Sequence, residues 1–241
     1  TGVQTCALPI LSTPRREARE LPPLRRSLRL ARADGRGAGA RREAQAGGEH
    51  PGAGGGGVRD EGTAYSPIPE RAARHAIDAT VRSAASRGGR PMVVCCPLVY
   101  GPPAWPGRES VQLPHLVKDA LTHGVARYVG AGEARWSYCH IDDIAEAYAL
   151  ALAKGQPGAL YYPESGEQSW AELAARIGRV LGVPARSWTL EEAIAAWGQR
   201  ALWTYSSNAR TRGVRIRNDL GWTPHSDDID EDIRRLAGKI L

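Results

Sequence analysis

The sequence contains no phenylalanine, and its basic side chains are 29 arginines against only three lysines. This bias is typical of translation from GC-rich DNA and excludes no function by itself. Long apolar runs are also missing, since no stretch reaches the roughly 20 residues of a membrane-spanning helix. The apolar run 6–11 is short and lacks the basic start of a signal peptide. We therefore expect a cytoplasmic protein with no membrane partner.

The excess of positive charge is confined to the N-terminal part of the chain. Residues 11–60 carry 11 arginines and six acidic side chains, a net +5, whereas residues 61–241 carry 21 basic and 20 acidic side chains, a net +1. Most of the chain is thus near neutral and shows no basic face for nucleic acid. A basic-tailed nucleic-acid binder, suggested only by residues 11–60, is the weaker alternative.

Cysteine is scarce, with four residues at positions 6, 95, 96 and 139, none of them in a Cys-x-x-Cys pair. Cys95 and Cys96 are neighbours, so in a strand they point to opposite sides. This arrangement favours buried free thiols in a reducing compartment over a metal or redox site. No metal is therefore expected.

Residues 1–60 are unlike the rest of the chain. Residues 1–10 resemble the conceptual translation of a sequencing adapter, and residues 11–60 are rich in Arg, Ala, Gly and Pro without a sustained period. Such a composition cannot bury enough apolar area to offset chain entropy, which predicts a disordered N-terminal tail. The glycine-rich stretches 35–40 and 52–57 lack the preceding buried strand that a dinucleotide-binding turn needs.

The α/β pattern begins near residue 61 and centres on the run MVVCC at 92–96. This apolar run follows a proline and precedes another, which predicts a strand buried on both faces, as in a parallel sheet. Residues 97–102 follow as a loop at the carboxyl end of the strand, where open parallel sheets bind their ligands. We expect this strand to have an unpaired or poorly covered edge beside the tail.

Helical and extended patterns alternate around this strand. Apolar spacing, capping boxes and closing glycines predict helices over 70–86, 111–123, 141–154, 170–181 and 190–201, and one that opens at Ser226. Short strands are predicted over 126–129, 136–139 and 159–162. In the first helix, Ala73, Ile77 and Val81 are expected to face the core.

Three short motifs follow one another in the second half of the chain. They are PLVYGP at 97–102, HIDDIA at 140–145 and LGWTP at 220–224. In this order they resemble the NAD(P)-dependent epimerase/dehydratase family, the extended and atypical short-chain dehydrogenase/reductases, over about residues 61–241. The resemblance implies an α/β fold, an incomplete NAD(P)-binding Rossmann fold with a smaller mixed α/β substrate lobe. The expected parts are an anomalous segment 1–60, a partial Rossmann domain 61–160, and a substrate-binding lobe with C-terminal helices 161–241.

The resemblance implies NAD or NADP as the cofactor. It places the backbone of Leu98 and Val99, which follow Pro97, near the nicotinamide. The family's catalytic Tyr-x-x-x-Lys belongs on the helix before this strand, but Glu70 and Arg74 occupy those positions. Arg74 could hold a ribose hydroxyl, although its guanidinium cannot titrate usefully. An i,i+4 ion pair of Glu70 with Arg74 is the simpler interpretation, and no catalytic residue is assigned.

Three residues are candidate contacts of a small-molecule substrate. Tyr100 follows the strand and either reaches the substrate or packs as an amphipathic ring. Arg135 stands one place before the position where sugar-nucleotide enzymes of the family carry a diphosphate-binding arginine, and Trp136 fills that position. A nucleotide-sugar substrate is therefore not favoured. His140 and Asp143 are interpreted as structural residues that fix the start of the helix after them.

The leading hypothesis is a truncated, atypical family member, because the first Rossmann strands and their glycine-rich turn are expected before residue 61 and are not found there. The parent activity would be that of an oxidoreductase or isomerase acting on a small carbonyl or hydroxyl compound. A non-catalytic NAD(P)-sensing protein of the same fold is the alternative, motivated by the missing Tyr-x-x-x-Lys. The sequence does not indicate the substrate, the choice between NAD and NADP, or the oligomeric state.

Overall fold

The computed structural model of this protein describes residues 8–12, 57–64, 69–105, 109–226 and 228–240. The strands are β1 (Leu8–Ser12), β2 (Arg90–Val94), β3 (Leu98–Tyr100), β4 (Ala126–Val129), β5 (Arg135–His140), β6 (Leu160–Tyr161), β7 (Gly166–Ser169) and β8 (Ala185–Trp188). The α-helices are α1 (Pro69–Ser83), α2 (Gln112–His123), α3 (Ile141–Lys154), α4 (Trp170–Leu181), α5 (Leu190–Trp197), α6 (Val214–Leu220) and α7 (Ile229–Ile240). A 3-10 helix over Ala84–Arg87 follows α1, and a π-helix over Ala201–Tyr205 follows α5.

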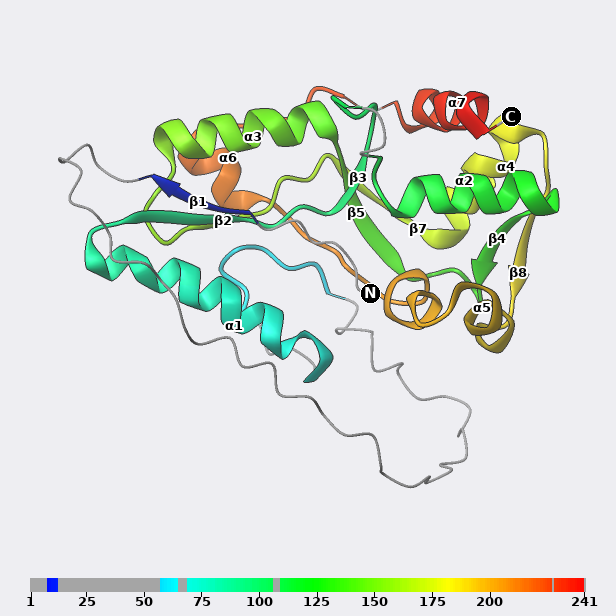
Figure 1. The fold of residues 1–241 in the computed structure, drawn as a ribbon, viewed down its shortest axis with the longest axis horizontal. Helices are drawn as coiled ribbons and strands as arrows, with labels where there is room; N and C mark the ends of the chain where they lie inside the picture. Colours follow the sequence, from blue (N-terminus) through cyan, green and yellow to red (C-terminus); the bar gives the residue numbers. More distant parts are fainter. Residues whose placement is uncertain (1–7, 13–56, 65–68, 106–108, 227, 241) are drawn as a thin grey trace, which may run out of the picture.

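Strand β2 lies between β1 and β6 in a three-stranded sheet. It runs parallel to β6, with Val93 opposite Leu160. Helix α1 covers one face of this sheet, whereas α3 and α6 cover the other (Figure 1). Because helices lie on both faces, Met92, Val93 and Val94 are only 0–2% exposed. The predicted α/β fold, with a strand buried on both sides, is confirmed.

The prediction that this strand has an unpaired or poorly covered edge is wrong. Strand β1 pairs antiparallel with β2 over its whole length, with Leu8 opposite Val94 and Ser12 opposite Arg90. A buried strand presents a row of N–H and C=O groups at its edge, and an apolar segment of the same chain satisfies them here. The remainder of the predicted tail, up to residue 56, lies outside the described residues.

A second three-stranded sheet contains β3, β5 and β7, with β5 in the middle. Strand β3 runs parallel to β5, so that Tyr100 lies opposite His140, whereas β7 runs antiparallel to β5. Residues 97–102 are therefore not the simple loop that was predicted. Three of them form β3, because β5 offers hydrogen-bond partners from a distant part of the chain. Strands β4 and β8 form a separate parallel pair.

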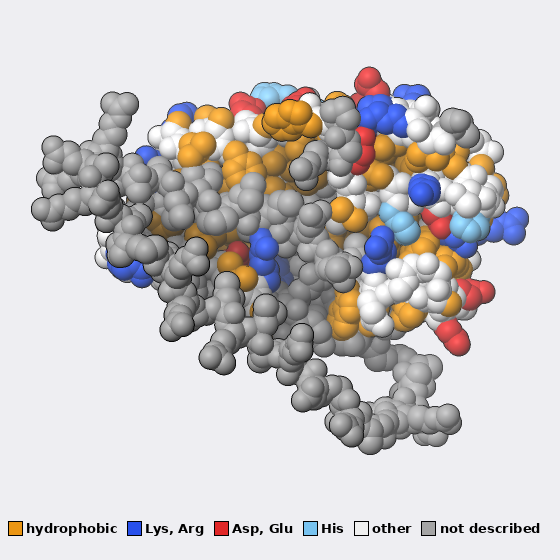
Figure 2. All heavy atoms as spheres, in the orientation of Figure 1, with side chains coloured by type: hydrophobic (Ala, Val, Ile, Leu, Met, Phe, Trp, Pro, Cys, Tyr) orange, Lys and Arg blue, Asp and Glu red, His pale blue; other side chains and the backbone are white. Residues whose placement is uncertain are grey.

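Most predicted elements are present with shifted ends. Helices α3 and α4 and strand β4 have the predicted bounds. The helix predicted over 190–201 is shorter, because α5 ends at Trp197 and Gly198 follows it with φ +66°. Strands β7 and β8 and helix α6 were not predicted. Each helix within the described residues is too short or too polar to span a lipid bilayer. On the described part of the face seen in Figure 2, basic and acidic side chains lie interspersed with apolar ones.

The inward face expected for α1 is wrong at its centre. Ala73 is exposed and Ile77 is 56% exposed, whereas Arg74, Asp78 and Val81 are half-buried. The latter three recur at helical spacing, and α1 packs against β2. A charged pair rather than an apolar stripe therefore lies on the sheet side of this helix.

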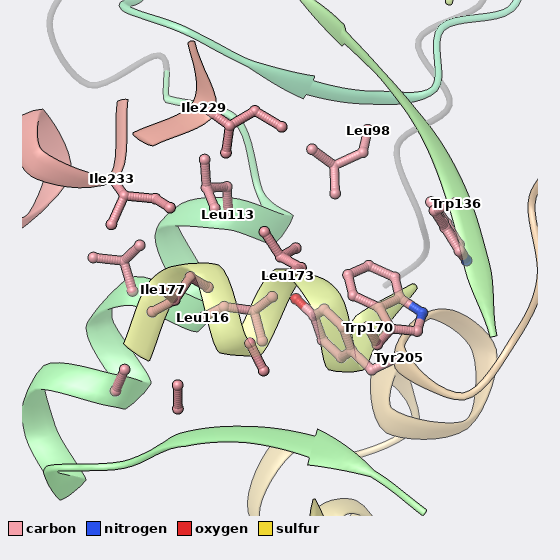
Figure 3. Packing of buried hydrophobic residues seen from close by; sticks show 14 of the residues in the cluster. Leu98, Leu113, Leu116, Trp136, Trp170, Leu173, Ile177, Tyr205, Ile229 and Ile233 are labelled. Atoms are coloured by element: carbon pink, nitrogen blue, oxygen red, sulfur yellow. The ribbon is translucent and has the colours of Figure 1, made fainter. Parts of the chain in front are cut away.

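Two clusters of buried side chains form the interior. The sheet cluster packs β2 and β6 against α3 and α6, and contains Met92, Val94, Cys96, Cys139, Ile144, Ala147, Ala151, Ala159, Tyr161, Ile216, Leu220 and Trp222. The lobe cluster packs α2, α4 and α7 with β4 and the π-helix (Figure 3), and includes Leu98, Leu113, Leu116, Trp136, Trp170, Leu173, Ile177, Tyr205, Ile229 and Ile233. The clusters interleave along the chain, since α2 belongs to the lobe cluster and α6 to the sheet cluster.

Candidate functional site

The carboxyl end of β2 is the first part of the candidate site. Cys95 continues the strand pairing, since its N–H donates to the Tyr161 carbonyl at 2.9 Å. Arg74 and Asp78 of α1 form an ion pair of 3.6 Å, and both act electrostatically on the Cys95 thiol. The structure thus places Arg74 near the strand end that leads into Pro97.

The described cysteines are free thiols, as predicted. Burial, with smaller contributions from Cys96 and Asp78, raises the pKa of the Cys95 thiol to about 12. Burial also raises the pKa of Cys139. A protonated thiol is a poor nucleophile and a poor metal ligand. Within the described ranges, no group of three or more His, Cys, Asp or Glu side chains could hold a metal ion.

Strand β3 turns its side chains into the protein rather than toward a ligand. Leu98 is 2% exposed and joins the lobe cluster, and Val99 packs against the sheet cluster. Tyr100 is fully buried, and its hydroxyl donates to the Ser226 carbonyl at 3.1 Å. Its ring lies edge-on to His140, 5.2 Å away between centroids. Tyr100 therefore packs, and Leu98 and Val99 can offer a cofactor only their backbone.

His140 and Asp143 have the structural roles that the sequence predicted. The Nδ1 atom of His140 accepts the Asp142 N–H at 3.2 Å and caps α3. The Asp143 carboxylate accepts the N–H groups of His225 at 3.0 Å and of Ser226 at 3.1 Å. These bonds tie the start of α3 to the segment that precedes α7.

Arg135 and Trp136 stand at the opposite end of β5 from His140. At about 3.3 Å per residue, the five-residue separation places Arg135 about 16 Å along the strand from His140 and its partner Tyr100. Trp136 is 6% exposed, and its indole N–H donates to the Ser207 carbonyl at 2.6 Å. The candidate substrate residues therefore do not gather at one place, and Trp136 is placed in the core.

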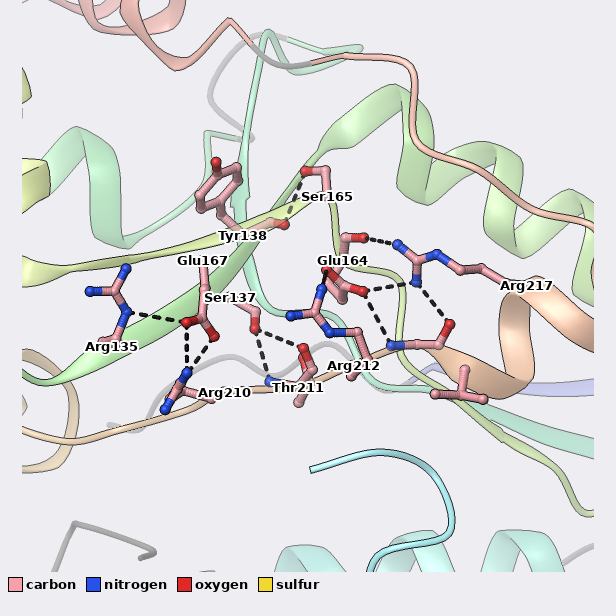
Figure 4. Close-up of polar contacts among 12 residues, drawn as sticks. Arg135, Ser137, Tyr138, Glu164, Ser165, Glu167, Arg210, Thr211, Arg212 and Arg217 are labelled. Atoms are coloured by element: carbon pink, nitrogen blue, oxygen red, sulfur yellow. Dashed lines mark hydrogen bonds and ion pairs between the residues drawn. The ribbon is translucent and has the colours of Figure 1, made fainter. Parts of the chain in front are cut away.

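One face of β5 and β7 carries a network of polar side chains (Figure 4). Arg135 donates to the Glu167 carboxylate at 3.2 Å, and Arg210 donates to the same carboxylate at 2.8 Å. Hydrogen bonds from Arg210 lower the pKa of Glu167, which keeps this carboxylate ionised at neutral pH. The Ser137 hydroxyl accepts the Thr211 N–H at 2.9 Å and donates to the Thr211 carbonyl at 3.1 Å.

The network continues to α6 through Glu164, which is 1% exposed. Its carboxylate accepts from Arg217 at 2.8 Å and from the Gly213 N–H at 3.3 Å, and lies 3.6 Å from Arg212. We call the whole set the polar face: Arg135, Ser137, Glu164, Glu167, Arg210, Arg212 and Arg217. Sequence reasoning named only Arg135. A signal existed for Glu164, which follows a predicted strand at its carboxyl end.

Glu61 is a second buried carboxylate that sequence reasoning missed, at 8% exposure. Its oxygens accept the N–H groups of Tyr162 at 3.1 Å, Val214 at 3.0 Å and Arg215 at 2.9 Å. It thereby caps α6, whose own N-cap residue, Gly213, has no side chain for that purpose. This contact anchors the segment before α1 to the end of β6.

The described residues fit one end of a dinucleotide cofactor. The end of β2 offers the Arg74 guanidinium and the backbone of Leu98 and Val99. A Gly-x-x-Gly-x-x-Gly turn, which would bind a pyrophosphate at a helix N-terminus, does not occur in residues 57–241. The donor set of these residues therefore suits the nicotinamide and its ribose, and not the pyrophosphate.

Known proteins resemble much of the chain. An uncharacterized protein of Schizosaccharomyces pombe is 29% identical over 175 residues, which are 71% of this chain and 57% of that protein. An uncharacterized protein of Saccharomyces cerevisiae is 33% identical over 129 residues, 52% of this chain and 42% of that protein. The oxidase ucsJ of Acremonium sp is 27% identical over 178 residues, 62% of this chain and 50% of that protein. The chain spans about half the length of these curated relatives.

Solved structures share the fold. DesIV, a dTDP-glucose 4,6-dehydratase from Streptomyces venezuelae with NAD and TYD bound, gives a TM-score of 0.59 at 22% identity, covering 77% of this chain and 56% of that one. The dTDP-glucose 4,6-dehydratase of Bacillus anthracis in complex with NAD gives 0.59 at 19% identity, covering 78% and 57%. The model of the NAD dependent epimerase/dehydratase family matches residues 39–162. The chain therefore belongs to the NAD-dependent epimerase/dehydratase family.

Proposed function

We propose that this chain forms the nicotinamide-facing and substrate-facing part of an NAD(P)-dependent oxidoreductase or isomerase that acts on a small carbonyl or hydroxyl compound. The observation that supports this most is that the Arg74 guanidinium acts electrostatically on Cys95, which lies between the end of β2 and the backbone of Leu98 and Val99. Arg74 would hold a ribose hydroxyl, and that backbone would border the carboxamide. When bound, the nicotinamide supplies a hydride donor or acceptor. Structures of similar fold hold NAD and NADPH.

The polar face supports a substrate that carries hydroxyl or carbonyl groups rather than a diphosphate. Arg135 and Arg210 both donate to Glu167, and Arg135 also lies 3.0 Å from Glu172. The two other arginines of the polar face, Arg212 and Arg217, share Glu164. Four arginines thus stand against three carboxylates, so most of the positive charge is compensated, which weakens the attraction for a phosphate group. Together with the Ser137 hydroxyl, the same side chains still offer hydrogen-bond donors and acceptors. We propose a compound smaller than the nucleotide sugars named for the neighbouring structures.

A fluorescence titration with NADH and with NADPH tests the cofactor part of this proposal. The wild-type protein should bind at least one of them, and Arg74→Ala should bind about tenfold more weakly, since it loses a charge-assisted hydrogen bond. Arg87→Ala removes an exposed arginine just beyond the same helix and should bind as the wild type does. Absence of binding by the wild type, or equal affinity of Arg74→Ala, would contradict the proposal.

A non-catalytic NAD(P)-responsive role is the second candidate. No tyrosine in the sequence has a lysine four residues on, and an arginine at position 74 cannot accept and return a proton near neutral pH. Binding of NADH or NADPH without turnover on a panel of aldehydes, ketones and alcohols would favour this role. We propose a cytoplasmic location for either one, supported by the free thiols of Cys95, Cys96 and Cys139.

A further inference from the structure

The C-terminal helix α7 binds the residue that follows β3. The Gly101 N–H donates to the Asp232 carboxylate at 2.8 Å, and the Gly101 carbonyl accepts from the Arg235 guanidinium at 3.3 Å. Asp232 and Arg235 are paired with each other, with Nε 2.6 Å from the carboxylate. One ion pair on α7 thus satisfies both backbone groups of a residue that lies 131 and 134 positions earlier in the chain.

Gly101 has no room for a side chain at this position. Its φ is +107°, a conformation that favours glycine. A Cβ at this residue would lie 2.5 Å from Nε2 of His140 and 2.9 Å from Cγ2 of Ile141. Since His140 caps α3, the end of β3 is fitted between the start of α3 on one side and α7 on the other.

The ion pair extends beyond Gly101. The Arg235 guanidinium also lies 3.5 Å from the Glu109 carboxylate, which accepts from Lys239 at 2.8 Å. Asp232 itself is only 4% exposed. A buried ion pair adds little net stability compared with apolar packing of the same volume. Its main contribution at this point is therefore a fixed geometry for the backbone that it binds.

We propose that Asp232 and Arg235 are positioning residues that hold the backbone from Leu98 to Gly101 in place. Strand β3 is three residues long and lies at the edge of its sheet, paired only with β5 among the described strands. Without the bonds to α7, so short a strand would fray from its Gly101 end. The functional consequence rests on the proposed function, because this backbone is the part that would border the nicotinamide.

Amide hydrogen exchange measured by NMR, combined with the NADH and NADPH titrations, tests the proposal. In Asp232→Ala, the amides of Tyr100 and Gly101 should exchange about tenfold faster or more, and cofactor affinity should fall about tenfold. Asp232→Asn keeps one acceptor oxygen and should recover part of both losses. Glu231→Gln is the matched control, since Glu231 is the exposed neighbour on the same helix, and it should change neither measurement.

Several outcomes would overturn the proposal. One is unchanged exchange at Tyr100 and Gly101 in Asp232→Ala, and another is equal acceleration of all amides, which marks a purely structural role. Local acceleration with unchanged cofactor affinity would also overturn it. If Asp232→Ala does not fold, Asp232→Asn carries the same comparison. If the wild type binds neither NADH nor NADPH, the proposed function fails, and exchange at these two amides alone decides whether α7 positions the strand.

Discussion

The sheet cluster and the lobe cluster differ in how their aromatic rings are held. In the sheet cluster, each ring reaches a polar partner on another element. The Trp222 indole N–H donates to the Asp143 carbonyl at 2.9 Å, and the Tyr161 hydroxyl donates to Asp219 at 3.2 Å. These bonds join the segment after α6 to α3, and β6 to α6. Polar groups and packing therefore act together around the parallel strands.

In the lobe cluster, the rings pack mainly against one another. Trp170 lies 5.5 Å from Trp136 and 5.0 Å from Tyr205 between centroids, and Trp197 lies 5.0 Å from Tyr205. The indole nitrogens of Trp170 and Trp188 are buried without a hydrogen-bond partner among the described residues. A chain without phenylalanine fills its core with rings that carry polar atoms. Other lobe rings do find partners, since Trp136 donates to Ser207 and Trp197 donates to Asp119. The comparison therefore shows that both rings of the sheet cluster bond their polar atoms, whereas the lobe leaves two of its indole nitrogens unsatisfied.

Replacing Glu61 tests whether the sheet cluster depends on a polar anchor outside it. In Glu61→Gln, one carboxylate oxygen becomes an amide NH2 group that faces N–H donors of Val214 and Arg215, or of Tyr162. Buried donors then lose their acceptor, and we expect the free energy of unfolding to fall by about 3 kcal/mol. Urea denaturation followed by circular dichroism measures this loss.

Glu133→Gln is the control for this experiment, because Glu133 is exposed. Its unfolding free energy should lie within about 0.5 kcal/mol of the wild type. If Glu61→Gln were as stable as this control, packing alone would hold α6 on the sheet. The sheet cluster would then be held mainly by packing, as the lobe cluster is.

Two matched substitutions sharpen the comparison of the rings. Trp222→Phe and Trp170→Phe remove the same indole N–H and similar ring area from the two clusters. Only Trp222→Phe removes a hydrogen bond, the one that the indole donates to the Asp143 carbonyl, so it should cost about 1.5 kcal/mol more than Trp170→Phe. Urea denaturation of both variants gives the difference. Equal losses would mean that the hydrogen bond of Trp222 adds nothing beyond its packing.

The elements that could be predicted are those with local signals. Helix α4 begins where Ser169 and Glu172 form a capping box, with the Glu172 N–H donating to the Ser169 hydroxyl at 3.1 Å and the Ser169 N–H donating to Glu172 at 2.7 Å. Both residues stand beside the helix in the sequence. Helix α6 gave no such signal, because its cap is Glu61, 153 positions before Val214. The residues next to a helix cannot predict its start when the capping residue lies in a distant part of the sequence.

The same reasoning explains the missed strands and the missed site residues. Strand β7 has the polar sequence GEQS and is a strand because β5 pairs with it. The polar face likewise needs three separate segments, which carry Arg135, Glu167 and Arg210, to meet at β5. By contrast, the family resemblance named Arg74 on the helix before β2, and Arg74 does lie on that helix, α1. A contact of Arg74 with a cofactor stays a prediction.

The smallest expected effect concerns Glu167, which joins β7 to the segment that carries Arg210. Its carboxylate should make the free energy of unfolding depend on pH. Hydrogen bonds from Arg210 lower the pKa of Glu167 below its ordinary value of 4.5. The unfolded chain therefore takes up a proton at higher pH than the folded one. The stabilisation by this carboxylate is fully present above pH 4.5 and is lost as the pH falls through the lowered value.

Glu167→Gln should accordingly be less stable than the wild type by about 1 kcal/mol at pH 7, the upper end for ion pairs that remain in contact with solvent. The difference should shrink as the pH falls below 4.5, because the wild-type carboxylate is then neutralised as well. Urea denaturation of both proteins across this range measures the difference directly, and other titrating groups cancel between them. Stability curves that stay parallel down to the lowest pH would mean that the two arginines hold the strand junction by packing, as the rings hold the lobe cluster.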